Sequence, residues 1–226
     1  MHGLGSYKES WLAPRTKFEE KSTQLKDDLL SRGYNLLIPD APFHGERSYE
    51  LDFLPAHLLP PEISQSTEAA EKMVELYQNS VQEIRLMVDL IQAQASGTPE
   101  QIHLVGYSLG GAVAILVNAV DDRLGSIAAC VPPINRPISE VKSFNWPEGL
   151  VKKLAEVTPF SHAEQQKAPT AIFYGEEDIY YSQTEIQDFY LRAPVPEKLV
   201  KGYPTGHELP ASYIQDVIEW IEQHSA

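Results

Sequence analysis

The sequence predicts an α/β fold in which a mostly parallel sheet is flanked by helices. Short aliphatic runs alternate with longer amphipathic segments along the chain, which is the pattern of strands joined by helices. Each short run is bounded by Gly, Pro or Asp. The chain has 226 residues, a length that favours one domain over residues 1–226 with a sizeable buried core.

Five short runs are predicted strands, because each is rich in aliphatic residues and ends at a turn-forming residue. They span residues 34–39, 101–107, 126–131, 170–174 and 198–202. Four segments before, between and after them have helical periodicity. The first ends at Gly33, the second carries an apolar stripe over residues 73–91, the third is the apolar segment 112–120, and the last, 213–221, follows Pro210.

Composition excludes several classes of function. Lys and Arg number 18 against 32 Asp and Glu, a net charge of −14 that repels nucleic acids and anionic membranes. The longest strongly apolar run, residues 112–117, is too short to cross a bilayer. No signal-peptide pattern follows Met1, and Cys130 is the single cysteine, expected to be a buried, inert thiol. These features predict a cytoplasmic protein without disulfides.

Two Pro-rich segments interrupt the alternation, at residues 43–66 and 132–168. Both follow predicted strands at their carboxyl ends, the edge where open α/β sheets bind ligands. We therefore expect both to shape a substrate pocket, with residues 132–168 forming a cap or lid insertion.

Residues 106–110 read G-x-S-x-G, with a predicted strand before them and an apolar helix after them. This context is typical of a nucleophile elbow, in which a strained turn presents the serine hydroxyl. Ser108 is therefore the candidate nucleophile, and the backbone N–H of Leu109 a candidate donor to an oxyanion. The alternative is a glycine-rich packing turn that carries a surface serine.

A serine nucleophile needs a base, and three histidines follow Ser108: His162, His207 and His224. His207 alone comes after a predicted strand and before the last helix, which makes it the candidate base. Asp178 follows another strand and is the candidate for orienting the base.

Two adjacent carboxylates, Glu176 and Glu177, compete with Asp178 for the orienting role. A loop cap is the structural alternative for Asp178.

The motifs together resemble those of the α/β-hydrolase superfamily over essentially the whole chain. The matching pieces are His2-Gly3, residues 40–47, the Ser108 elbow, residues 175–178 and Gly206-His207. The likeness is to serine esterases and lipases, and residues 40–47 also resemble prolyl-oligopeptidase-like esterases. The resemblance implies a second oxyanion donor at the N–H of Leu4 and a structural role for His44, with a contact to the pocket as the alternative for His44.

The chain departs from the family at its start, because a strand precedes the His-Gly loop in the family and here only Met1 does. Two explanations are open: the fold is N-terminally shortened, or residues 34–39 pair directly with residues 101–107. A missing strand leaves backbone groups unpaired and loosens the Leu4 donor, so we expect activity below that of a complete family member.

The predicted function is hydrolysis of a small-molecule carboxylic ester through a Ser-His-Asp triad and an acyl-enzyme, with no cofactor. His44 and Glu46 lack metal-site spacing, so no metal is expected. Thioester or peptide cleavage and acyl transfer use the same triad and stay open, as does a non-catalytic module that binds a ligand. Aromatic residues of the later chain are expected either to line an acyl pocket or to pack in the core: Trp146, Tyr180, Tyr181 and Tyr190.

Overall fold

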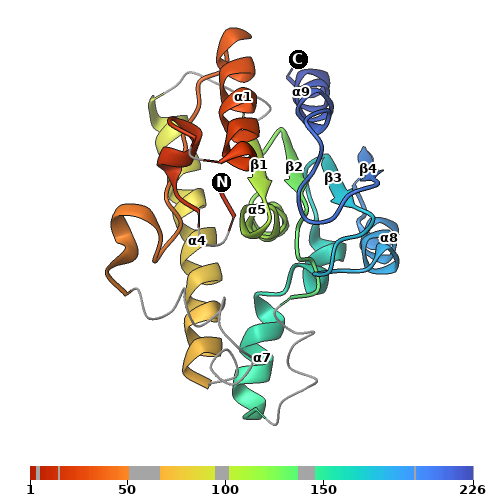
Figure 1. Cartoon of the computed structure of the whole chain (residues 1–226). Coiled ribbons are helices and arrows are strands. Elements are labelled where there is room, and N and C mark those ends of the chain that lie inside the picture. Colours follow the sequence, from red (N-terminus) through yellow and green to blue (C-terminus); the bar gives the residue numbers. More distant parts are fainter. Residues whose placement is uncertain are drawn as a thin grey trace.

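The computed structural model describes residues 1–3, 6–14, 16–50, 67–94, 102–136, 146–195 and 197–225. Within these residues, four parallel strands form one sheet in the order β1-β2-β3-β4 (Figure 1). They are β1 (His103–Tyr107), β2 (Ser126–Cys130), β3 (Thr170–Gly175) and β4 (Lys198–Tyr203). The predicted α/β fold with a parallel sheet is confirmed.

The strand register brings the carboxyl ends of the strands to one edge of the sheet. Tyr107 pairs with Cys130, Cys130 pairs with Phe173, and Gly175 pairs with Tyr203. The loops that follow β1, β3 and β4 carry the three candidate catalytic residues. The topology therefore delivers all three to the same edge.

Helices α1, α4, α5 and α9 lie where the sequence periodicity predicts them, whereas it does not predict α7 and α8. In Figure 1, α1 and α9 lie above the strands and α5 lies below them. Helix α5 packs against β1, β2 and α4, whereas α9 packs against β2 and α1. The α-helices are α1 (Lys17–Ser31), α4 (Thr67–Gln94), α5 (Leu109–Val120), α7 (Glu148–Glu156), α8 (Gln183–Arg192) and α9 (Tyr213–Gln223). The 3₁₀ helices are η1 (Lys8–Trp11), η2 (Gly45–Glu50) and η4 (Pro159–Gln165).

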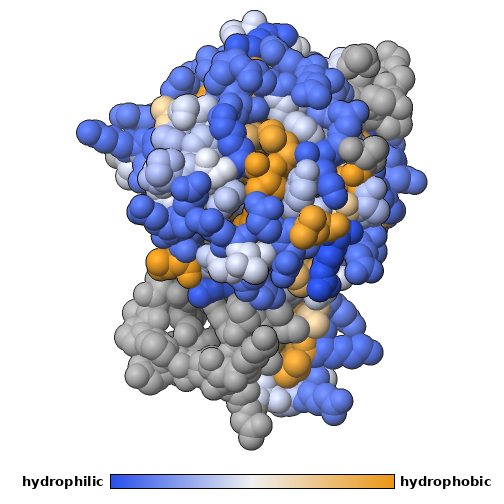
Figure 2. All heavy atoms as spheres, turned by 90° about the vertical axis from the view of Figure 1, so that its right-hand side faces the viewer, coloured by the Kyte–Doolittle hydropathy of each residue, from blue (hydrophilic) through white to orange (hydrophobic). Residues whose placement is uncertain are grey.

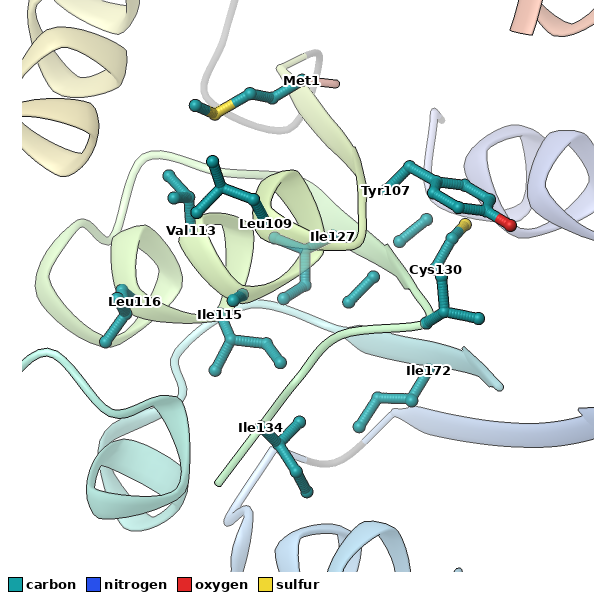
Figure 3. Packing of buried hydrophobic residues seen from close by; sticks show 14 of the residues in the cluster. Met1, Tyr107, Leu109, Val113, Ile115, Leu116, Ile127, Cys130, Ile134 and Ile172 are labelled. Atoms are coloured by element: carbon teal, nitrogen blue, oxygen red, sulfur yellow. The ribbon is translucent and has the colours of Figure 1, made fainter. Parts of the chain in front are cut away.

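The core lies between α5 and the sheet, as the apolar character of the predicted helix indicates. Figure 3 shows Val113 and Ile115 of α5 close to Ile127 of β2, and all three are fully buried. Cys130 of β2 is also buried, and this burial raises the pKa of its thiol to about 12. The thiol therefore stays protonated and packs as a small apolar side chain.

The prediction of a strand at residues 34–39 is wrong. These residues have no regular secondary structure, and their backbone does not pair with β1. Together with β1, they line a cavity of about 660 Å³, which lies between the two segments. Among the described residues, Met1 alone bonds to the backbone at this edge of β1: its amino group donates to Val105, and its carbonyl accepts from Tyr107.

The proposed cap segment, residues 132–168, contains α7 and η4, and residues 137–145 of it lie outside the described residues. Helix α7 packs against α4, and η4 packs against α5 and α8. A lid role for this segment, and the single domain over the whole chain, stay predictions. Of the other Pro-rich segment, residues 51–66 lie outside the described residues.

The outer surface is largely hydrophilic on the face that Figure 2 presents, with small separate apolar patches. No helix among the described residues is both long enough and apolar enough to cross a membrane.

Candidate active site

Ser108 lies at a sharp turn between β1 and α5. Its backbone is in a left-handed region, with φ 53° and ψ −114°, which a non-glycine residue rarely adopts. Its N–H donates to the carbonyl of Cys130 at 2.8 Å, which fixes the turn against β2. A Cβ at Gly106 would lie 2.0 Å from the Gly110 carbonyl oxygen, so the tight turn requires glycine there. This is the geometry of a nucleophile elbow.

His207 lies on the loop between β4 and α9 and bridges the other two candidate residues. Its Nε2 is 2.8 Å from the Ser108 Oγ, and its Nδ1 is 2.6 Å from the Asp178 Oδ2. The structure thus brings the three residues singled out in the sequence into one hydrogen-bonded chain, in the order hydroxyl, imidazole and carboxylate. Their spacing is that of a nucleophile, a base and an orienting acid.

The Asp178 carboxylate is covered by protein but well supplied with donors. Burial alone would raise its pKa, yet the bonds from His207 and from the Tyr180 N–H, at 2.9 Å, hold that pKa below its usual value. The side chain is therefore ionised at neutral pH and acts as an acceptor. It follows that His207 carries its proton on Nδ1, which leaves Nε2 free to accept the proton of Ser108.

The competing residues lie elsewhere. Glu176 and Glu177 are exposed, and neither forms a hydrogen bond with His207. His162 bonds to the carbonyl of Glu156 at 2.8 Å, and His224 pairs with Glu197 at 2.9 Å. Of the candidate acids and bases in the sequence, Asp178 and His207 are therefore the pair that lies with Ser108 at the sheet edge.

The two oxyanion donors expected from the sequence, Leu109 and Leu4, stay predictions. Leu109 directly follows Ser108 as the first residue of α5, and its N–H has no hydrogen-bond partner among the described residues. Leu4, the other expected donor, lies outside the described residues. Gly3, the residue before Leu4, lies close to Ser108, since a Cβ at Gly3 would be 3.3 Å from the Ser108 Cβ.

His2 anchors the start of this loop and is buried. Its Nε2 accepts from the Ala41 N–H at 3.0 Å, its Nδ1 donates to the Gly3 carbonyl at 2.8 Å, and its own carbonyl accepts from Gly110 at 3.2 Å. Burial lowers the pKa of His2 to about 4, so the ring is neutral at pH 7. Its bonds tie the His-Gly pair to α5.

His44 is fully buried and its Nδ1 donates to the Pro42 carbonyl at 2.7 Å, a local bond that fits the structural role expected of it. Glu46 pairs with Lys8 at 2.9 Å. The described part of the chain contains no group of three or more His, Cys, Asp or Glu side chains arranged to hold a metal ion.

The predicted aromatic residues divide between the site and the scaffold. The Tyr180 ring packs edge-on against the His207 ring, with 4.6 Å between their centroids. The Arg136 guanidinium lies over the same Tyr180 ring, 4.9 Å from its centroid. The Tyr181 hydroxyl accepts from the Gly175 N–H at 3.1 Å and helps to lower the pKa of Asp178. Tyr190 instead contacts Lys198, and Trp146 is half-buried.

Sequence reasoning missed the supporting roles of Tyr107 and Tyr181. The Tyr107 hydroxyl bonds to the loop that carries His207, and Tyr181 supports Asp178. The G-x-S-x-G pattern allows any residue type at position 107, so the motif gives no signal for the bond from Tyr107 to the His207 loop. The spacing of the motifs does not mark the bond from Tyr181 to Asp178 either.

Solved structures from several organisms have a similar fold. The crystal structure of TT1662 from Thermus thermophilus has a TM-score of 0.71 and 21% sequence identity, and the match covers 100% of this chain and 87% of that one. The Pyrococcus furiosus esterase Pf2001 has a TM-score of 0.66 and 18% identity, with 100% and 82% covered. A Paleococcus ferrophilus monoacylglycerol lipase has a TM-score of 0.61 and 17% identity, with 100% and 93% covered.

No curated protein matches the chain in sequence. A family model described as "Alpha/beta hydrolase family" matches residues 1–219, nearly the whole length. The matched region includes the Ser108 elbow, the Asp178 loop and His207. The chain therefore belongs to the α/β-hydrolase family.

Proposed function

We propose that this protein is a serine hydrolase that cleaves carboxylic esters through Ser108, His207 and Asp178. The observation that carries the proposal is the continuous chain of hydrogen bonds from the Ser108 hydroxyl through His207 to Asp178. The esterase and the lipase among the similar structures support the choice of an ester as substrate.

In the proposed reaction, the Ser108 Oγ attacks the ester carbonyl carbon while His207 Nε2 takes the hydroxyl proton. The oxygen of the tetrahedral intermediate accepts from the Leu109 N–H and, as we propose, from that of Leu4. As the carbon–oxygen bond to the alcohol breaks, His207 returns the proton to the departing oxygen and an acyl-enzyme is left. Water activated by His207 then hydrolyses the acyl-enzyme, and no cofactor takes part.

Asp178 acts by orientation and charge. Its carboxylate accepts from His207 Nδ1 at 2.6 Å and stabilises the imidazolium that forms when the ring takes the proton of Ser108. Tyr180 borders the same imidazole. Tyr180 is 37% exposed, so its ring is available to contact an apolar part of the substrate.

A fluorophosphonate probe tests the proposal, because it labels only an activated serine nucleophile. The wild-type protein should be labelled at Ser108, and Ser108→Ala should not be labelled although it keeps its thermal unfolding transition. A folded wild-type protein that resists the probe would instead support the non-catalytic ligand-binding module.

Substrate assays then decide the leaving group. Short- and long-chain nitrophenyl esters should give a burst of nitrophenol followed by steady turnover, the sign of an acyl-enzyme. Acyl-CoA and peptidyl substrates are the comparison. Faster turnover of either would mean that the substrate class is a thioester or a peptide and not an ester.

A further inference from the structure

Tyr107 bonds through its hydroxyl group to the base loop, the loop that carries His207. It is the last residue of β1 and directly precedes Ser108, and its side chain is 7% exposed. The hydroxyl donates to the His207 carbonyl at 2.9 Å and accepts from the Leu209 N–H at 3.1 Å. A single side-chain oxygen therefore bridges two backbone groups on either side of Glu208.

The loop from β4 to α9 has few other points of attachment. Before His207, Thr205 accepts from the Glu177 N–H at 3.0 Å, and after it, the Leu209 carbonyl accepts from Lys21 at 2.7 Å. Among the described residues, the Tyr107 hydroxyl is the sole partner of the His207 backbone. The His207 ring bonds to Asp178 and Ser108, whereas its backbone bonds to the Tyr107 hydroxyl.

The ring of Tyr107 adds a second contact. It lies edge-on to the His207 imidazole, with centroids 6.4 Å apart, and edge-on to Tyr213 of α9 at 6.0 Å. Figure 3 shows the ring above Cys130, with the hydroxyl pointing away from the apolar cluster. Burial raises the pKa of this phenol above its usual value, so the hydroxyl keeps its proton and remains a donor at working pH.

We propose that Tyr107 is a positioning residue, which fixes the His207 imidazole at bonding distance from Ser108 by bridging the His207 carbonyl and the Leu209 N–H. The inference rests on the proposed hydrolase function. Because Tyr107 and Ser108 are adjacent on one rigid strand end, the bridge couples the nucleophile directly to the loop of its base. A displacement of about 1 Å between reacting groups can cost about 100-fold in rate, which gives the bridge its importance.

Tyr107→Phe tests the bridge because it removes the hydroxyl and keeps the ring. We expect kcat for a nitrophenyl ester and the rate of fluorophosphonate labelling to fall about 10- to 100-fold, with KM nearly unchanged. The matched control is Tyr203→Phe. That tyrosine is 5% exposed, and its hydroxyl bonds to Asp216 away from the three candidate residues, so the control should keep the wild-type rate.

A second pair of variants separates positioning from a general loss of structure. In a His207→Ala background, Tyr107→Phe should change the residual rate no further, because the bridge acts through His207. An equal fall in both backgrounds would overturn the proposal, and so would an unchanged rate for Tyr107→Phe in the otherwise wild-type protein.

Rescue provides the remaining test, and it also serves if Tyr107→Phe does not fold. Incorporation of para-aminophenylalanine at position 107 restores an N–H donor toward the His207 carbonyl, so most of the labelling rate should return. A folded protein with this residue and no recovered rate would contradict the bridge. Failure of the wild-type protein to be labelled would instead end the proposed hydrolase function, so the two failures are distinguishable.

Discussion

The Ser108 hydroxyl and the His207 imidazole lie 2.8 Å apart, although 99 positions separate the two residues in the chain. The contact exists because β1 and β4 are parallel strands of one sheet and both end at the same edge. Ser108 is held by its strained turn, and His207 is held by Asp178 on one side and by the Tyr107 bridge on the other. The following variants examine how this arrangement is supported.

Asp178→Asn should lower kcat by about 10⁴-fold while leaving the fold intact. The amide can donate to His207 Nδ1, which would place the ring proton on Nε2 and prevent it from accepting the Ser108 proton. Steady-state kinetics with a nitrophenyl ester measures the loss. Glu177→Gln is the matched control, since Glu177 is exposed and only one position away. Loss of activity in the control with retention in Asp178→Asn would reassign the acid.

Gly175→Ala, at the end of β3, should displace the loop that carries His207. A Cβ at Gly175 would lie 1.9 Å from the carbonyl oxygen of Gly206, the residue before His207. We expect the free energy of unfolding to fall by about 1–3 kcal/mol through overpacking, and kcat to fall as well. Urea denaturation and ester kinetics measure the two effects.

Gly149→Ala is the comparison for that variant, because a Cβ at Gly149 of α7 meets nothing within 4 Å. It should be neutral or should raise the free energy of unfolding by up to about 1 kcal/mol, as alanine favours a helix over glycine. Equal losses in the two variants would show that the contact at Gly206 does not matter.

Acidification should destabilise the protein through His2. The pKa of this buried ring is about 4 in the fold against 6.5 for a free histidine. Between these values the unfolded chain binds a proton that the folded chain excludes, so the free energy of unfolding falls as pH drops from 6.5 towards 4. The contribution of His2 is at most about 3 kcal/mol.

His2→Gln isolates that contribution, because His103 also has a pKa lowered to about 4 by burial and adds to the pH dependence of the wild-type protein. Urea denaturation at several pH values should show a shallower slope for the variant than for the wild type. Identical slopes would mean that His2 titrates normally in the fold.

Asn118→Leu should reduce stability without touching the three candidate catalytic residues. The fully buried Asn118 amide donates to Gln166 at 2.9 Å and to Thr170 at 3.0 Å, and its oxygen accepts from the Ala168 N–H at 2.9 Å. Loss of these bonds leaves buried polar groups unpaired, at a cost of about 3 kcal/mol, or a fall in Tm of about 6–12 °C.

Calorimetry measures this change, and Asn35→Leu provides the control because Asn35 is exposed and has no hydrogen bond to the described residues. The control should shift the free energy of unfolding by less than about 0.5 kcal/mol. A loss as large in Asn35→Leu would mean that apolar substitution, rather than the buried network, lowers the stability.

The sequence by itself determined the features that depend on neighbouring residues. The alternation of apolar runs and helical stripes specifies the four strands of the described sheet and the helices α1, α4, α5 and α9, because side-chain periodicity reflects local backbone geometry. The G-x-S-x-G pattern likewise marks the turn at Ser108, since only that spacing lets the strand enter α5 without a collision at Gly106. The order of candidate serine, acid and histidine is also readable directly.

Only the tertiary structure decided which remote groups meet. Residues 34–39 have the composition of a strand but lie across a cavity from β1, and a strand forms only where a partner backbone is within bonding distance. The sequence favours Asp178 as the acid but leaves Glu176 and Glu177 as rivals, and the path of one loop brings Asp178 within bonding distance of His207. The Tyr107 bridge depends on the approach of β1 to a loop 100 positions away, a distance that no local pattern encodes.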